Sequence, residues 1–183
     1  MFETFFDDLG FETTYTLDRT LEYPPDGEWG LPEVVVKGRR LHADPAPRAI
    51  VRPRESAPFL LSDTFVSGVE FYGSPDPRML CAFSQFGTAV LLDTEEPHAS
   101  IDLPVYATAV AAATDENLLL FAEFTRVIAV GPLGVVWTSE EVFTDDLHIR
   151  RSDNGRIVCR GYRYYEDKTS EITLDAATGH LIG

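Results

Sequence analysis

Short apolar and β-branched runs, separated by turn-forming residues, recur along almost the whole chain. The central run, Leu118–Trp137 (LLLFAEFTRVIAVGPLGVVW), predicts two or three strands around a Gly-Pro-Leu-Gly turn. Tyr106–Thr114 is rich in alanine, but its β-branched residues and its place between strands favour a strand. Further strands are predicted at Thr13–Leu17, Glu33–Lys37 and Phe65–Tyr72, with turns at Pro24–Gly27 and Ser152–Gly155. This pattern predicts an all-β fold.

The apolar pattern also repeats with a period of about forty residues. Matching segments begin at Leu80 and Leu118, and a looser copy begins at Ile157, which places repeats at about 80–117, 118–156 and 157–183. Such a period is typical of propeller blades or stacked hairpins, but an evenly turned meander produces it too. Three repeats cannot close a propeller of about four to eight blades. We therefore expect an antiparallel meander of blade-like hairpins, arranged as a partial propeller, a sandwich or a barrel.

A length of 183 residues fits one β domain, 1–183. The stretch 44–58 contains four prolines, which cannot donate to a strand ladder. It predicts an edge, a loop or an extended connection, and it is the one internal boundary that we expect.

The first ten residues place Phe2, Phe5, Phe6 and Leu9 at helical spacing. This spacing predicts a short amphipathic N-terminal helix that ends at Gly10. It could dock a partner or form a dimer arm, or it could pack as a lid on one end of the sheet.

The formal net charge of −15 is unevenly distributed. Residues 61–116 contain nine acids and a single base, Arg78. Such acidity disfavours nucleic acid as a partner and favours a protein, such as one with a basic surface, although it also increases solubility.

A basic stretch precedes this acidic region. Its cations are Lys37, Arg39, Arg40, Arg48, Arg52 and Arg54. Arg39, Arg40, Arg52 and Arg54 are candidates for an anion-binding site, because a guanidinium group suits bidentate acceptors. The alternatives are internal pairing with the acidic region and a charged edge that discourages aggregation.

Candidate chemistry is sparse. Asp146 and His148 would share a face of a strand or turn, as weak candidates for a metal site or an Asp–His pair of a hydrolase. Neither a third ligand nor a nucleophile motif lies near them in sequence, and acidic pairs such as Glu140-Glu141 fall in predicted turns. We therefore predict neither catalytic residues nor a cofactor.

Aromatic residues gather late in the chain. Trp137, Tyr162, Tyr164 and Tyr165 are candidates for a binding surface for a sugar or a peptide, or else Trp137 is a core anchor and the tyrosines lie on a half-exposed hairpin.

Cys81 and Cys159 are too few for a disulfide scaffold, and we expect both to be reduced and to fill strand faces. The sequence has neither a secretory signal pattern nor a membrane-length apolar run, which predicts a cytoplasmic protein without a membrane span. Oligomers stay possible.

The segment Ile172–Ile182 (ITLDAATGHLI) resembles the closing strand pair of pyrroloquinoline-quinone-type propeller repeats. Val127–Trp137 is similar, with its tryptophan where those blades often have one. This local resemblance covers about residues 118–183 and implies blade-like local structure, without the quinone.

Together these features predict a non-catalytic acidic binding or protein-interaction module. The surface of first interest joins residues 61–116 to the hairpins of Trp137 and Tyr162–Tyr165. One alternative is a small hydrolase or metal-dependent enzyme centred on Asp146 and His148. The other is an inhibitor or immunity-type protein that blocks a basic partner.

Overall fold

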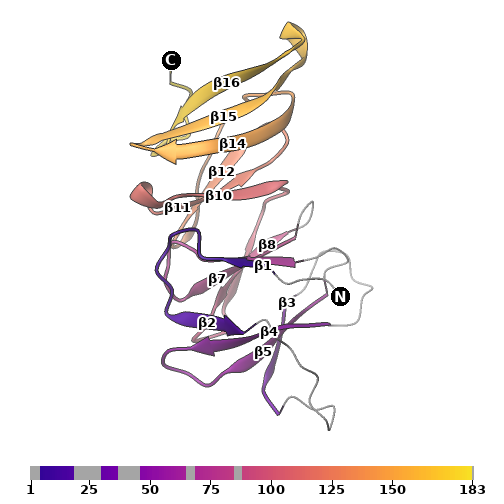
Figure 1. Cartoon of the computed structure of the whole chain (residues 1–183), viewed down its shortest axis with the longest axis vertical. Helices are drawn as coiled ribbons and strands as arrows, with labels where there is room; N and C mark the ends of the chain where they lie inside the picture. Colours follow the sequence, from indigo (N-terminus) through magenta and orange to yellow (C-terminus); the bar gives the residue numbers. More distant parts are fainter. Residues whose placement is uncertain (1–4, 19–29, 37–45, 65–68, 85–87, 183) are drawn as a thin grey trace. The chain divides into compact units, whose positions relative to one another are not determined.

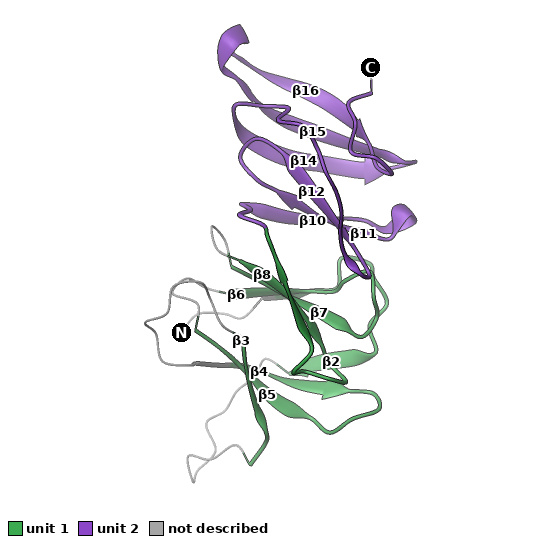
Figure 2. Ribbon diagram, turned by 180° about the vertical axis from the view of Figure 1, so that it is seen from behind, with its two compact units in different colours: residues 1–104 green, residues 105–183 purple. Residues whose placement is uncertain are grey.

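The computed structural model describes residues 5–18, 30–36, 46–64, 69–84 and 88–182. Within these ranges the chain is all-β, as predicted, with two single turns of 3-10 helix and no sheet that closes into a barrel. Two compact units, residues 1–104 and 105–183, divide the chain (Figure 2). The predicted turn at Pro24–Gly27 lies outside the described residues.

Unit 1 contains two sheets (Figure 1). The five-stranded sheet has the order β1 (Phe5–Asp7), β6 (Val69–Tyr72), β7 (Met79–Ser84), β8 (Ala89–Asp93) and β9 (Ser100–Leu103). The four-stranded sheet has the order β2 (Tyr15–Asp18), β4 (Ala46–Pro53), β5 (Phe59–Asp63) and β3 (Glu33–Val36). Strands β6 to β9 form an antiparallel meander, whereas β1 is parallel to β6 and β3 is parallel to β5.

The core of unit 1 is formed by both of its sheets. Leu61 of β5, Phe71 of β6 and Leu80 of β7 are completely or almost completely buried in one cluster. The hydroxyl of Tyr15 donates to the carbonyl oxygen of Met79 at 3.3 Å, which satisfies the one polar atom of this buried ring. Burial raises the pKa of Tyr15, so its phenol stays neutral.

The predicted N-terminal helix is wrong where the structure describes it: residues 5–7 form strand β1. After this strand, the carboxylates of Asp7 and Asp8 accept backbone N–H groups from Leu9 and Gly10 respectively, each at 2.8 Å. These bonds form a turn in which Leu9 and Gly10 have positive φ. A helix this short is intrinsically unstable, and pairing with β6 gives the segment better hydrogen bonds. Phe6 packs edge-on against Tyr15 of β2, with ring centroids 6.3 Å apart, so the segment is an edge strand of one sheet that contacts the other sheet of unit 1.

The proline-rich stretch is not an edge, because β4 lies between β2 and β5. Its pairing with β5 is irregular between Pro47 and Ala49, where proline has no N–H to donate. At this irregularity Arg48 forms an ion pair with Asp63, with 2.7 Å between Nε and Oδ2. The boundary between the compact units follows Pro104 instead.

Unit 2 contains two antiparallel meanders (Figure 1). One comprises β10 (Ala109–Ala113), β11 (Leu118–Ala122), β12 (Val127–Gly131) and β13 (Gly134–Thr138), with η1 (Thr114–Glu116) between the first two strands. The other comprises β14 (Asp145–Asp153), β15 (Arg156–Arg163) and β16 (Lys168–Asp175), with η2 (Tyr164–Glu166) before the last strand. The strand predicted at Tyr106–Thr114 is confirmed as β10, and the turn predicted at Ser152–Gly155 joins β14 to β15.

One apolar cluster joins the two sheets of unit 2. Leu120 and Ala129 come from the first sheet, and Leu147, Ile157 and Leu174 come from the second. The three sequence copies begin in β7, β11 and β15, each the second strand of its meander.

Both cysteines are buried and free. Burial raises the pKa of both thiols, that of Cys159 to about 12, so at pH 8 only about one Cys159 thiol in 10⁴ is a thiolate. We therefore expect no reaction of the native protein with Ellman's reagent at pH 8, and two thiols per chain in guanidinium chloride. Stoichiometric labelling of either cysteine in native buffer would contradict this burial.

Candidate functional site

A groove of about 500 Å³ opens in unit 2. Its walls are the segment before β14, the η2 turn and the turn that follows β16. It is lined by Glu140, Glu141, Val142, Phe143, Thr144, Arg163, Tyr165, Glu166, Gly179 and Leu181.

The wall before β14 is held by hydrogen bonds rather than by a regular strand. The N–H groups of Val142 and Phe143 donate to the carbonyl oxygen of Thr125 at 2.9 and 3.3 Å. Both the N–H and the hydroxyl of Thr144 donate to the carbonyl oxygen of Tyr162 at 2.9 Å, and the Thr144 hydroxyl accepts from the N–H of Tyr164 at 2.8 Å. These bonds fix the wall to β15 and to the η2 turn, so the groove is built into the fold.

Phe143 forms the apolar floor. Its ring lies against Gly161, where an added methyl group would approach the ring to 2.5 Å. The guanidinium carbon of Arg163 lies 5.7 Å from the ring centroid, a cation–π contact. Arg163 also donates to Glu166 at 3.1 Å, so it is held in place from both sides.

Two of the three glutamates in the groove lack a counter-charge within the described part of the chain. Glu166 bonds with Lys168 at 2.9 Å and Arg163 at 3.1 Å, and these two hydrogen bonds lower its pKa. Glu140 and Glu141 are exposed, and neither forms an ion pair with another described residue. The groove therefore presents two uncompensated carboxylates to solvent.

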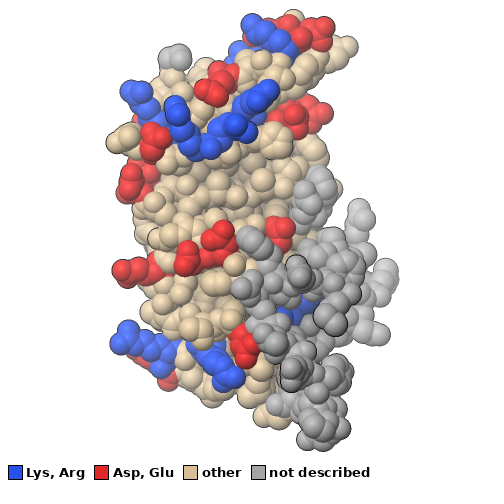
Figure 3. Space-filling model, in the orientation of Figure 1, with Lys and Arg blue, Asp and Glu red and all other residues tan. Residues whose placement is uncertain are grey.

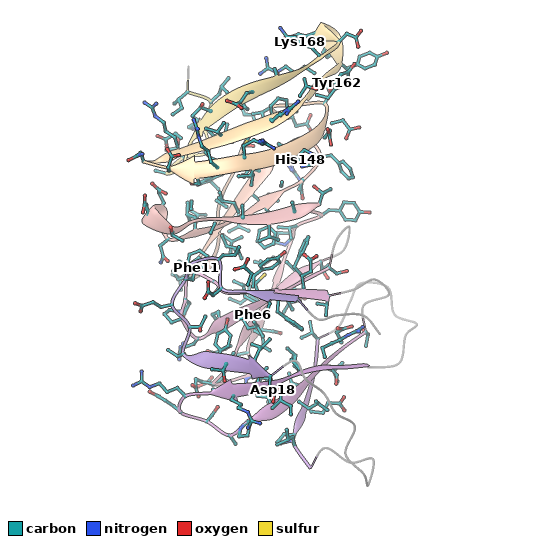
Figure 4. The ribbon with its side chains drawn as sticks, viewed as in Figure 1. Phe6, Phe11, Asp18, His148, Tyr162 and Lys168 are labelled. Carbon is teal, nitrogen blue, oxygen red and sulfur yellow. The ribbon has the colours of Figure 1, made fainter. Side chains whose placement is uncertain are left out.

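Two of the predicted binding tyrosines project from the η2 turn. Tyr164 is 73% exposed and Tyr165 is 94% exposed, and their rings form an edge-on pair 6.3 Å apart. Tyr165 lines the groove, whereas Tyr164 does not. Tyr162 lies in β15 at this end of the sheet (Figure 4), and its hydroxyl donates to Asp167, which raises the pKa of its phenol.

Trp137 lies in the core, whereas a residue of a binding surface must be exposed. Its side chain is buried, with 9% exposed, and Nε1 donates to the carbonyl oxygen of Ala176 at 2.9 Å. Its ring packs against Gly179, where an added methyl group would approach the ring to 2.4 Å. Trp137 is therefore the core anchor of the alternative interpretation, and it supports the turn that forms one rim of the groove.

That turn is also fixed internally. The carboxylate of Asp175 accepts from the N–H of Thr178 at 2.9 Å and from its hydroxyl at 2.8 Å, which lowers the pKa of Asp175. After the turn, Leu181 forms an isolated bridge with Leu174 of β16.

Asp146 and His148 do meet, with 2.9 Å between Oδ1 and Nε2. Both side chains are exposed, and Asp146 has positive φ. Among the residues that the structure describes, three potential metal ligands never gather in one place. The pair is a surface contact in β14, and the metal or hydrolase role stays a hypothesis.

The predicted anion site is only partly within the described chain. Arg39 and Arg40 lie outside it, whereas Arg52 and Arg54 are exposed in and after β4. Arg48 shows the internal pairing that the sequence suggested, because its partner Asp63 belongs to the acidic region and is 1% exposed.

A smaller hollow of about 330 Å³ lies in unit 1 beside β3. Val34, Val36, Val90 and Leu92 give it apolar walls, and Glu33, His98 and Asp102 also line it. Because β3 leads directly into residues that the structure does not describe, the groove in unit 2 is the better-defined site.

Comparisons with protein-family models and with curated proteins give no match to this chain. The helices in the described ranges are single turns, and none has the length and apolar character needed to cross a membrane. The site must therefore be interpreted from its own geometry.

Sequence reasoning found Tyr165 but missed Phe143, Arg163 and the role of Glu140 and Glu141. The acidic pair resembles an ordinary turn. Only the folded backbone, which brings residues 140–144 beside residues 163–166, distinguishes it from other acidic pairs.

The Trp137 contact can be tested with two glycines that share the same backbone angle. Gly179 and Gly155 both have φ +72°, but a methyl group at Gly155 meets only a glutamate oxygen at 3.7 Å. We expect Gly155→Ala to lower the free energy of unfolding by about 1–2 kcal/mol, and Gly179→Ala by about 2–5 kcal/mol, because it also overpacks the Trp137 ring. Urea unfolding followed by circular dichroism measures both. Equal losses would show that the tryptophan contact contributes nothing.

Proposed function

We propose that this chain is a non-catalytic, acidic protein-interaction module, and that the groove of unit 2 binds a basic segment of a partner protein. One observation carries the proposal: Glu140 and Glu141, without counter-charges in the described chain, line a groove of about 500 Å³ together with the exposed Tyr165 and Leu181.

A lysine or arginine side chain suits this combination of groups. Its aliphatic stem can lie on Leu181, which is 55% exposed, while its charged head reaches a carboxylate. The face of Tyr165 offers a cation–π contact, for which arginine is better suited than lysine. The overall charge of −15 would also accelerate the encounter with a basic partner.

An inhibitor or immunity-type protein would use the same contacts with a basic partner. It would differ from a simple interaction module only in that binding abolishes the partner's activity. The enzyme alternative rests on the contact between Asp146 and His148. Removing His148 would abolish such an activity, but it would leave the groove and its ligand unchanged.

The blade-like interpretation of residues 118–183 also stays a proposal. It is supported by the start of the sequence copies in β7, β11 and β15 and by the packing of Trp137 against the turn after β16. We further propose a cytoplasmic location, which the two free cysteines support.

The groove is tested with a fluorescein-labelled peptide that has two arginines, and with its glutamine counterpart. We expect the Glu140→Gln/Glu141→Gln variant to bind the arginine peptide about tenfold more weakly, because two charge-assisted contacts are lost. Fluorescence anisotropy at about 50 and 200 mM salt measures this difference and its salt dependence.

The matched control is Glu96→Gln/Asp115→Asn, which removes the same charge from exposed acids outside the groove. It should bind almost as well as the unaltered chain. If both variants lost affinity equally, net charge rather than the groove would explain binding. Equal affinity for the glutamine peptide would refute recognition of a cation.

A further inference from the structure

The outer face of the sheet β14–β16 carries a cluster of cations that is unexpected in so acidic a chain. We call Arg150, Arg151, Arg156 and Arg160 the arginine face. All four are exposed. Figure 3 shows Lys and Arg side chains in a band over the part of the surface that Figure 1 labels β14 and β15.

Strand register explains why these side chains share one face. Ile157 and Cys159 of β15 point into the core, so the alternate residues Arg156 and Arg160 point outward. On β14, Ile149 pairs with Cys159 and packs on the same core. Regular alternation after Ile149 would send Arg151 inward.

A β-bulge prevents this. Ile149 pairs with Cys159 and Arg151 with Val158, so Arg150 is an extra residue on β14. A bulge of this kind places two successive side chains opposite one residue of the neighbouring strand. Both Arg150 and Arg151 therefore lie on the outer face.

These arginines are largely unpaired. Arg151 lies 3.6 Å from Asp153, but Arg150, Arg156 and Arg160 form no ion pair with any residue that the structure describes. Every other described base of unit 2 has a carboxylate partner: Arg126 has Glu123, and Arg163 and Lys168 share Glu166.

Three acids lie opposite the face without neutralising it. Asp153 is in register with Arg156, but its carboxylate lies 3.6 Å from Arg151. Asp175 is in register with Arg156, but its carboxylate accepts two hydrogen bonds from Thr178. Glu171 is in register with Arg160 and forms no ion pair with it. The face therefore keeps free guanidinium groups for an external acceptor.

We infer that the arginine face binds an acidic, extended segment of a partner protein. Guanidinium groups suit carboxylates through paired hydrogen bonds. Arg156 and Arg160 are four residues apart on one strand, about 13 Å. Alternate side chains of an extended peptide repeat at about 7 Å, so acids four positions apart match the spacing of the two arginines.

A polypeptide fits better than a nucleic acid. Nucleic acid carries a negative charge at every nucleotide, and a chain of net charge −15 repels it beyond the small face. A short acidic segment concentrates its charge where the arginines lie.

The probe is a fluorescein-labelled Glu-Thr-Glu-Thr-Glu peptide, titrated with the full chain at low salt, beside its glutamine counterpart. We expect Arg156→Gln/Arg160→Gln to weaken binding at least tenfold. Arg156→Lys/Arg160→Lys should lose less, because lysine keeps the charge but not the planar fork. Glu171→Gln should tighten binding about two- to threefold, because it removes a carboxylate that repels the acidic peptide.

The matched control is Arg52→Gln/Arg54→Gln, which removes two exposed arginines from unit 1. It should bind the glutamate peptide like the unaltered chain. If this control lost affinity instead, the anion site would lie at Arg52 and Arg54 and the proposal would fail. Circular dichroism must show that each variant is folded.

Three further results would also overturn the proposal. One is equal binding of the glutamine peptide. Another is tighter binding of an oligothymidylate of the same length, which would assign the face to nucleic acid. The third is self-association that Arg156→Gln/Arg160→Gln abolishes, which would assign it to a second copy of this chain. The arginine peptide that tests the groove should bind the Arg156→Gln/Arg160→Gln variant at least as tightly as it binds the unaltered chain. This result distinguishes the groove from the arginine face.

Discussion

The contact between Trp137 and the turn after β16 is the constraint on which unit 2 depends. The indole of Trp137, on β13, lies in the core, donates to the carbonyl oxygen of Ala176 and packs closely on Gly179, and both of these residues belong to the turn after β16. Because the same turn forms a rim of the groove, the packing of the core and the shape of the site are set by one contact. A substitution that alters the packing of Trp137 would therefore also change the shape of the groove.

Much of the fold could be predicted from the sequence, because strands leave a local signal. The apolar runs of Leu118–Trp137 with their Gly-Pro-Leu-Gly turn, and the Asn-Gly turn at residues 154–155, were sufficient to place β11 to β13 and the hairpin of β14 and β15. The same reasoning failed at Phe5–Asp7, where apolar residues at helical spacing form a strand and the carboxylates of Asp7 and Asp8 cap the turn after it. It failed again at β4, because a bulge allows an inner strand to include proline. Both errors arose where hydrogen bonds to another segment outweighed local preference.

The candidate site was less predictable than the fold. Tyr165 could be proposed from its aromatic surroundings, but the groove also needs the wall of residues 140–144, whose position depends on bonds to Thr125 and Tyr162. The arginine face was hidden for a related reason. Composition and net charge average over the chain, whereas a register shift of one residue decides which side chains gather on a face. The charge of a face therefore depends on the register of each strand and not on the net charge of the chain.

The bridge between Leu174 and Leu181 also affects how the protein is handled. Because Leu181 lines the groove, a polypeptide appended after Gly183 would begin two residues beyond a side chain that forms the site. A carboxy-terminal affinity tag would therefore place its own side chains within reach of Glu140 and Glu141, and a polyhistidine tag at mildly acidic pH would act as a tethered cationic competitor. Ligand screening is better done with the purification handle at the amino terminus, or with the handle removed.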